Sequence, residues 1–141
     1  MNRILLDTNV LSETVNLRPD PQVSTWFATN GAASLCLSVV SLGELRRGVE
    51  LLDPGKRRTR LELWLDVSLA EWLGDGILPV TASVADCWGV MDAKRRRAGR
   101  PLDLADGLIA ATAQVHDLAL ATRNTKDFGG LGLTLVNPWR I

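Results

Sequence analysis

Three acidic residues follow predicted strands or begin predicted helices in this sequence. Asp7 comes directly after the apolar run 4–6, and Glu44 and Asp106 fall in the first turns of predicted helices. In open α/β sheets, ligands bind beyond the carboxyl ends of the strands. Parallel strands would therefore bring the three carboxylates to the same edge of the sheet, where a metal ion or a phosphate could bind.

Carboxylates gathered in this way favour a divalent cation. Two like charges about 4 Å apart cost on the order of 4 kcal/mol at an effective dielectric of 20, so the cluster must raise a pKa or bind metal. Oxygen ligands without thiolates or imidazoles suit Mg²⁺ or Mn²⁺, which assist phosphodiester hydrolysis. The predicted metal ligands are Asp7, Asp106 and Glu44, directly or through water.

Each acid also has a structural explanation. Ser41 and Glu44 have the spacing of a helix capping box. Asp103 and Asp106 resemble an acidic N-cap and a second acid in the first turn, where a helix favours negative charge by about 0.3–1 kcal/mol. Asp7 would then belong to the turn before the next helix. Helix capping or a turn can explain each acid taken singly. The location of all three at the same edge of the sheet favours a binding site.

Strands and helices alternate along the chain. Apolar runs predict strands, and apolar residues at steps of three and four predict the helices between them. The predicted strands cover 4–6, 35–40, 77–80, 118–122 and 133–136, and the later helices cover 42–52, 61–74, 83–98 and 102–117. This alternation implies βαβ units, so we expect a three-layer α/β fold with a central, mainly parallel sheet of four to five strands flanked by helices. No linker or repeat is visible, and one domain over 1–141 is expected.

Composition limits the classes of function. The chain has 141 residues, 46% of them hydrophobic, and a formal net charge of zero, so no overall positive field attracts nucleic acid. Two local basic clusters, 56–60 and 94–100, could contact phosphate or could simply be solvated helix surfaces. Cys36 and Cys87 have no paired spacing and are expected to be free thiols.

The sequence lacks the residues that several other classes of site require. His116 is the single histidine, so a Ser/His/Asp triad or a histidine-rich zinc site is disfavoured. Only three apolar residues precede Asp7, too few for a signal peptide, and no apolar run approaches the roughly 20 residues of a membrane span. A cytoplasmic protein is expected. Trp64 and Trp72 fall on an apolar helical stripe, which favours core or subunit packing over base stacking.

Five motifs follow one another along the chain: Leu6-Asp7-Thr8-Asn9, Glu44, the run 104–113, the run 121–128 and the terminal Asn137-Pro138-Trp139. Together they resemble the PIN domain, and within that family the VapC and FitB type of bacterial toxin. The resemblance covers nearly the whole chain. It implies a Mg²⁺- or Mn²⁺-dependent endoribonuclease, the toxin of a type II toxin–antitoxin system, inhibited by a cognate antitoxin and commonly assembled as a homodimer or larger complex. It places Asp7, Glu44 and Asp106 in the acidic site.

The sequence departs from the family pattern after the late strand. The family often has a fourth acid there, whereas this chain has the amide of Asn124, with Asp127 three residues further on. We expect Asn124 to face the metal and to complete the catalytic set, with Asp127 in a supporting role. Thr8 and Ser41 are expected to be polar support for the site. The number of metal ions depends on which of the two positions is used.

Two alternatives remain open. One is a non-catalytic PIN-like interaction module whose acidic pocket receives a basic segment of a partner. The other is a metal-dependent phosphatase or DNA nuclease on a related α/β scaffold, which the order of the motifs disfavours. Metal-dependent cleavage without a partner distinguishes the first alternative, and competition between RNA, DNA and small phosphates distinguishes the second.

Overall fold

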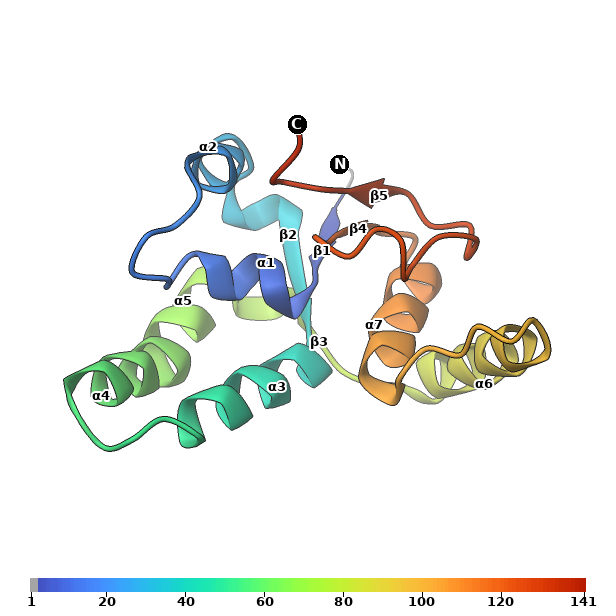
Figure 1. Ribbon diagram of the computed structural model, residues 1–141, viewed down its shortest axis with the longest axis horizontal. Coiled ribbons are helices and arrows are strands. Elements are labelled where there is room, and N and C mark those ends of the chain that lie inside the picture. The colour runs from blue at the N-terminus through green and yellow to red at the C-terminus, as the bar shows by residue number, and fades with distance from the viewer. Residues whose placement is uncertain (1–2) are drawn as a thin grey trace.

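A five-stranded parallel sheet forms the centre of the computed structural model, which describes residues 3–141 (Figure 1). The strand order is β3-β2-β1-β4-β5. The strands are β1 (Ile4–Leu6), β2 (Leu35–Ser38), β3 (Ile77–Leu78), β4 (Ala119–Ala121) and β5 (Leu135–Val136). Every pairing is parallel, which confirms the predicted α/β fold and places all carboxyl ends at one edge.

Helices cover both faces of the sheet. Helices α6 and α7 pack against each other, and in Figure 1 they lie on the opposite side of the sheet from α3, α4 and α5. The helices are α1 (Thr8–Glu13), α2 (Pro21–Thr29), α3 (Val39–Glu50), α4 (Lys56–Leu63), α5 (Leu69–Leu73), α6 (Ala82–Arg97) and α7 (Leu104–Val115). A π-helical turn (Trp64–Ser68) joins α4 to α5, and short 3-10 turns cover Ala32–Ser34 and Gly74–Gly76.

Helix α3 begins earlier than its apolar spacing predicts. The β-branched pair Val39 and Val40 reads as the end of a strand, but the strand stops at Ser38. The Ser38 hydroxyl accepts a hydrogen bond from the Val40 backbone N–H at 3.0 Å and caps the helix. Ser41 is therefore inside the helix, and the capping box suggested for Ser41 and Glu44 is wrong.

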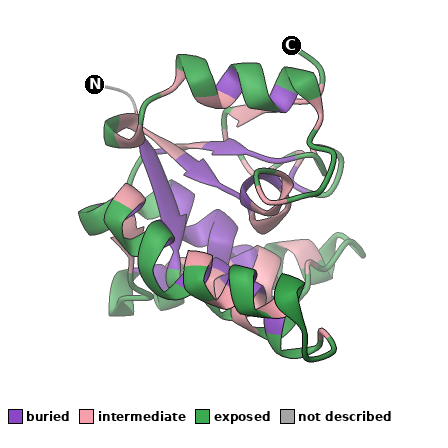
Figure 2. Cartoon of the chain, turned by 90° about the vertical axis from the view of Figure 1, so that its left-hand side faces the viewer, coloured by how far each residue is buried: buried purple, intermediate pink, exposed green. Residues whose placement is uncertain are grey.

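Alternate residues of the central strands build two cores. Leu6 and Leu37 belong to one hydrophobic cluster, whereas Leu5 and Cys36 belong to the other, as the two-residue period of a strand requires. All four are fully buried. Figure 2 shows the strands coloured mostly as buried. Near-continuous apolar strands are typical of a parallel sheet covered on both faces.

The predictions about tryptophan packing, free thiols and membrane spans are met in the described residues, whereas the helix predicted over 61–74 begins earlier, at Lys56. Trp64 and Trp72 pack against the first cluster, which confirms their assignment to packing. Cys36 and Cys87 are free thiols. Across residues 3–141, the helices are too short or too polar to span a membrane.

Candidate active site

The carboxyl ends of β1 and β4 form the base of the site. Leu6 pairs with Ala121, so the residues that follow them, Asp7 and Thr122, are neighbours although they are 115 positions apart. The Asp7 backbone N–H donates to the Ala121 carbonyl at 2.8 Å, and Thr122 Oγ1 donates to Asp7 Oδ2 at 2.7 Å. The sheet register therefore fixes the position of the Asp7 carboxylate.

Asp7 is buried and well hydrogen-bonded. Its side chain caps α1 by accepting from the Thr8 backbone N–H at 2.8 Å, and Asn9 Nδ2 lies 3.3 Å from Oδ2. The residue is only 4% exposed, and this burial raises the pKa of its carboxyl. The bonds from Thr122 and Thr8 lower that pKa, whereas the negative charges of Glu44 and Asp103 raise it further. Hydrogen bonding thus offsets part of the cost of burying this charge.

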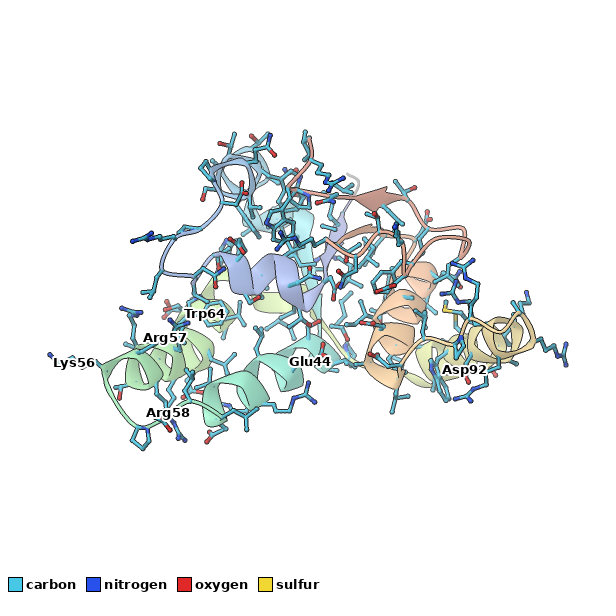
Figure 3. The ribbon with its side chains drawn as sticks, in the orientation of Figure 1. Glu44, Lys56, Arg57, Arg58, Trp64 and Asp92 are labelled. Atoms are coloured by element: carbon cyan, nitrogen blue, oxygen red, sulfur yellow. The ribbon has the colours of Figure 1, made fainter. Side chains whose placement is uncertain are left out.

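Glu44 reaches the same region from α3. Thr8 Oγ1 donates to Glu44 Oε1 at 2.7 Å, which ties α3 to the start of α1. Figure 3 shows Glu44 in the part of α3 that lies toward α1 and α7, and α3 contacts both helices. Arg47 lies 3.8 Å from Glu44 Oε2 but is itself largely exposed, so it neutralises this carboxylate only weakly.

Asp106 comes from the first turn of α7. Asp103 caps that helix by accepting from the Asp106 backbone N–H at 2.8 Å, so the cap suggested by the sequence is confirmed. The pKa of Asp106 is raised to about 7, first by burial and then by the nearby charges of Asp103, Asp7, Glu44 and Asp127, in that order. An acid that is half protonated near neutral pH is typical of functional sites.

Close packing of α6 on α7 holds Asp106 in place. A Cβ atom at Gly107 would lie 2.8 Å from the Trp88 ring, so the absence of a side chain allows this contact. The glycine beside the acid therefore serves helix packing.

The donor set fits a divalent cation by its chemistry. Within residues 3–141, no three His, Cys, Asp or Glu side chains form a ready-made ligand set. Mg²⁺, however, needs only one or two protein carboxylates and keeps several waters. Burial and then the neighbouring carboxylates raise the pKa of Asp106, and a cation bound between these acids would lower it again. The buried Ser41 hydroxyl of α3 has no hydrogen-bond partner among the described residues.

The structure brings most of the predicted site residues together. Asp7, Thr8 and Glu44 share hydrogen bonds, and Asp106 lies within electrostatic range of both acids. Asn124 is exposed, and its backbone N–H donates to Thr122 Oγ1 at 3.0 Å. The placement of its amide toward a metal stays a prediction.

Asp127 and Ser41 have different surroundings. Asp127 is exposed, and its charge raises the pKa of Asp106, so it lies near the acidic site. Ser41 is fully buried on the face of α3 that also carries Leu45 and Val49. Their supporting roles remain predictions.

Two residues of the site were not selected from the sequence. Asp103 was treated only as a helix cap, yet its charge acts on both Asp7 and Asp106. Thr122 was treated only as the end of a strand, yet it donates to Asp7. A polar residue directly after the strand that pairs with β1 was the available signal for Thr122.

Comparison with known proteins agrees with this geometry. A model of the PIN domain family matches residues 4–129. The chain belongs to the PIN domain family. It is 36% identical over 136 residues to "VapC ribonuclease Y4jK" of Sinorhizobium fredii, covering 96% of this chain and 97% of that protein. It is 37% identical over 136 residues to "Toxin FitB" of Neisseria gonorrhoeae, covering 96% and 98%.

Solved PIN structures share the whole fold. The crystal structure of FitAcB from Neisseria gonorrhoeae superposes with a TM-score of 0.92 at 36% identity, covering 98% of this chain and 99% of that one. DNA-bound VapBC from Salmonella typhimurium superposes with a TM-score of 0.83 at 24% identity, a likeness that concerns the fold alone. The PIN fold therefore extends over nearly all of the described residues.

Proposed function

We propose that this PIN protein is a Mg²⁺- or Mn²⁺-dependent endoribonuclease, the toxin of a bacterial type II toxin–antitoxin system acting in the cytoplasm. The observation that carries the proposal is the acidic cluster at the carboxyl edge of the sheet, where neighbouring carboxylates help to raise the pKa of Asp106 to about 7. The relatives named as a VapC ribonuclease and as a toxin support RNA as the substrate and a toxic outcome.

Asp7 and Asp106 would hold the ion directly, and Glu44 would hold it through water. When bound, such an ion activates water and neutralises charge on the scissile phosphate. Thr122 and the Thr8 N–H orient Asp7 through bonds of 2.7 and 2.8 Å, so its carboxylate is already positioned. The Thr8 hydroxyl, which donates to Glu44 at 2.7 Å, holds that side chain beside the site. Asn124 would add a neutral ligand or bind water.

A cognate antitoxin would cover apolar surface that the single chain exposes. Leu17 and Leu63 are 72% and 61% exposed and lie with Trp64 around one groove. We expect the antitoxin to supply an amphipathic helix here and a basic residue to the acidic cluster. Two similar solved structures, FitAB bound to a DNA fragment and a toxin–antitoxin complex from Klebsiella pneumoniae, support such a partner. A homodimer is also part of the proposal.

A non-catalytic acidic-pocket module is the alternative. The clustered acids, whose charges contribute to the raised pKa of Asp106, support it as well, because they would attract a basic side chain as they would a cation. Cleavage of RNA by the purified protein without a partner would exclude this alternative.

The deciding experiment combines cleavage with metal binding. Labelled RNA is incubated with the protein in Mg²⁺, in Mn²⁺ and in EDTA, with single-stranded DNA and a small phosphate ester as competing substrates. Metal that binds only the folded state should also raise the melting temperature. At a metal concentration 100 times the dissociation constant, the free energy of unfolding should increase by about 2.7 kcal/mol. No cleavage in either metal, together with an unchanged melting temperature, would contradict the proposal.

A further inference from the structure

A basic pocket lies beside the acidic site but is separate from it. It has a volume of about 460 Å³ and opens between α6, α7 and the loop after β4. Its cationic residues are Lys94, Arg95 and Arg100, and its main apolar residues are Val90, Met91 and Leu131. No Asp or Glu is among the described residues that line it. The pocket therefore combines positive charge with apolar surface.

Arg95 builds one wall of this pocket. Its Nη1 donates to the Gly129 carbonyl at 3.0 Å and its Nη2 donates to the Asp127 carbonyl at 2.8 Å. The loop after β4 is thus fixed to α6 by a charged side chain. Because these bonds use its guanidinium, Arg95 contributes structure as well as charge.

Lys94 and Arg100 supply the charges that are available to a ligand. Both are exposed, and neither forms an ion pair with any other residue in the described range 3–141. Arg96, by contrast, is paired with Asp92 at 2.7 Å on the same helix. An anion that enters the pocket would meet two uncompensated cations.

The pocket adjoins the acidic site through two short connections. Arg100 precedes Asp103, the cap of α7, by three residues, a separation of at most roughly 11 Å in a fully extended chain. Asp127, whose carbonyl binds Arg95, carries a carboxylate that acts on Asp106. An RNA strand bound at the acids could therefore extend along the segment 100–103 and the loop that carries Asp127 toward this pocket.

We propose that this pocket binds single-stranded RNA next to the scissile bond, with a phosphate on Lys94 and Arg100 and a base against the apolar lining. The inference rests on the proposed ribonuclease function and names a subsite for it. Proteins that hold single strands combine a positively charged groove with side chains on which bases stack, usually aromatic ones. Here Val90, Met91 and Leu131 supply the apolar surface for a base. A wall of carboxylates, which would repel the backbone, is absent from the described lining.

The test compares two basic clusters of the same chain. The variant Lys94→Ala/Arg100→Ala changes the pocket, and Lys56→Ala/Arg57→Ala changes exposed charges on α4, at the opposite end of the molecule from α6 (Figure 3). Binding of a fluorescein-labelled oligouridylate is measured in EDTA over a range of salt concentrations. Each lost phosphate contact should reduce the salt slope by ~0.7, so the pocket variant, which loses the one phosphate held by both side chains, should lose ~0.7 and the α4 variant should match the wild type.

Cys87 provides a second measurement at the same place. It lines the pocket and is half-buried, whereas Cys36 is fully buried, so Cys87 is the thiol that a maleimide should modify first. Oligouridylate should slow this modification in the wild type and in the α4 variant. It should not slow it in the pocket variant.

The outcomes separate this inference from the proposed function. If the wild type cleaves RNA but the pocket variant keeps the wild-type salt slope and Cys87 stays equally reactive with RNA, the subsite is wrong and the ribonuclease stands. Protection of Cys87 by polyglutamate but not by oligouridylate would also overturn it, because the pocket would then take an acidic protein segment. If the wild type neither binds nor cleaves RNA, both proposals fail.

Discussion

Asp7 and Asp106 lie at the starts of two helices and at the same sheet edge, but their surroundings differ. Asp7 is 4% exposed, and its carboxylate accepts hydrogen bonds from Thr8 and Thr122. Asp106 is less buried, yet its pKa rises to about 7, because nearby acids add to its burial while no hydrogen bond is among the causes that act on it. Burial alone therefore does not decide which carboxylate is destabilised.

The difference suggests separate roles for the two acids. The sheet and the α1 cap fix the position of the Asp7 carboxyl, whereas burial and four neighbouring acids raise the pKa of Asp106, so Asp106 would gain more from a bound cation. Substitutions at each position should therefore differ in their effects on stability, although both should stop cleavage.

The largest expected effect is on cleavage, in Asp7→Asn. We expect activity to fall by at least about 10²–10³-fold, because a positioned metal ion contributes several kcal/mol to catalysis. The fold should persist, since the amide oxygen still accepts from the Thr8 N–H. Asp20→Asn is the matched control, because Asp20 caps α2 through a 2.8 Å bond from Gln22. RNA cleavage and thermal melts measure both; unfolding of Asp7→Asn alone would indicate a purely structural cap.

Thr122→Val should have the next largest effect. It removes the hydroxyl that donates to Asp7 and should destabilise the metal-free protein by ~1.5–3 kcal/mol, the range for hydrogen bonds to charged groups. Thr112→Val is the control, because Thr112 is equally buried but donates to the Leu108 carbonyl. Urea unfolding compares the two variants, and equal losses of stability would show that the charge of Asp7 does not matter.

Asp106→Asn should stabilise the metal-free protein. In the wild type the raised pKa means that the folded state binds more protons than the unfolded state between pH 3.8 and about 7, so stability falls as the pH rises through this window. Removing the charge should abolish that fall in stability. At about pH 8 the free energy of unfolding should increase on the order of 1 kcal/mol after solvent screening, which raises the melting temperature by about 4 °C.

Melting curves in EDTA across this pH range, with wild type and Asp106→Asn side by side, check the effect. Added Mn²⁺ should stabilise the wild type and leave the variant nearly unchanged. If the stability of Asp106→Asn depends on pH as strongly as that of the wild type, the effect arises from another acid of the cluster.

The smallest effects should come from the loop after β4. Asn124→Asp should tighten Mn²⁺ binding, because a further negative charge strengthens attraction to the ion, and Asp127→Ala should reduce cleavage only a few-fold. Metal titration followed by melting temperature measures both. Loss of metal binding in Asp127→Ala with no change in Asn124→Asp would make Asp127 the fourth acid.

Local patterns in the sequence were enough to predict the strands, most helices and the three principal acids. Apolar runs mark the strands because both faces of a parallel sheet are buried, and acids next to strand ends or helix starts depend only on neighbouring positions. Local pattern failed at Val39 and Val40, where the Ser38 cap overrides β propensity. It also placed the start of α4 late, because the first turns of that helix are exposed and carry no apolar period.

Only the tertiary structure decided how these elements meet. The order β3-β2-β1-β4-β5 places β1 beside β4, and this neighbourhood lets Thr122 donate to Asp7. It also brings Asp103 into range of Asp7 and fixes Arg95 on the loop that carries Asp127. These contacts join residues 32 to 115 positions apart, and no periodicity within the chain encodes them, because they arise from the packing of whole elements.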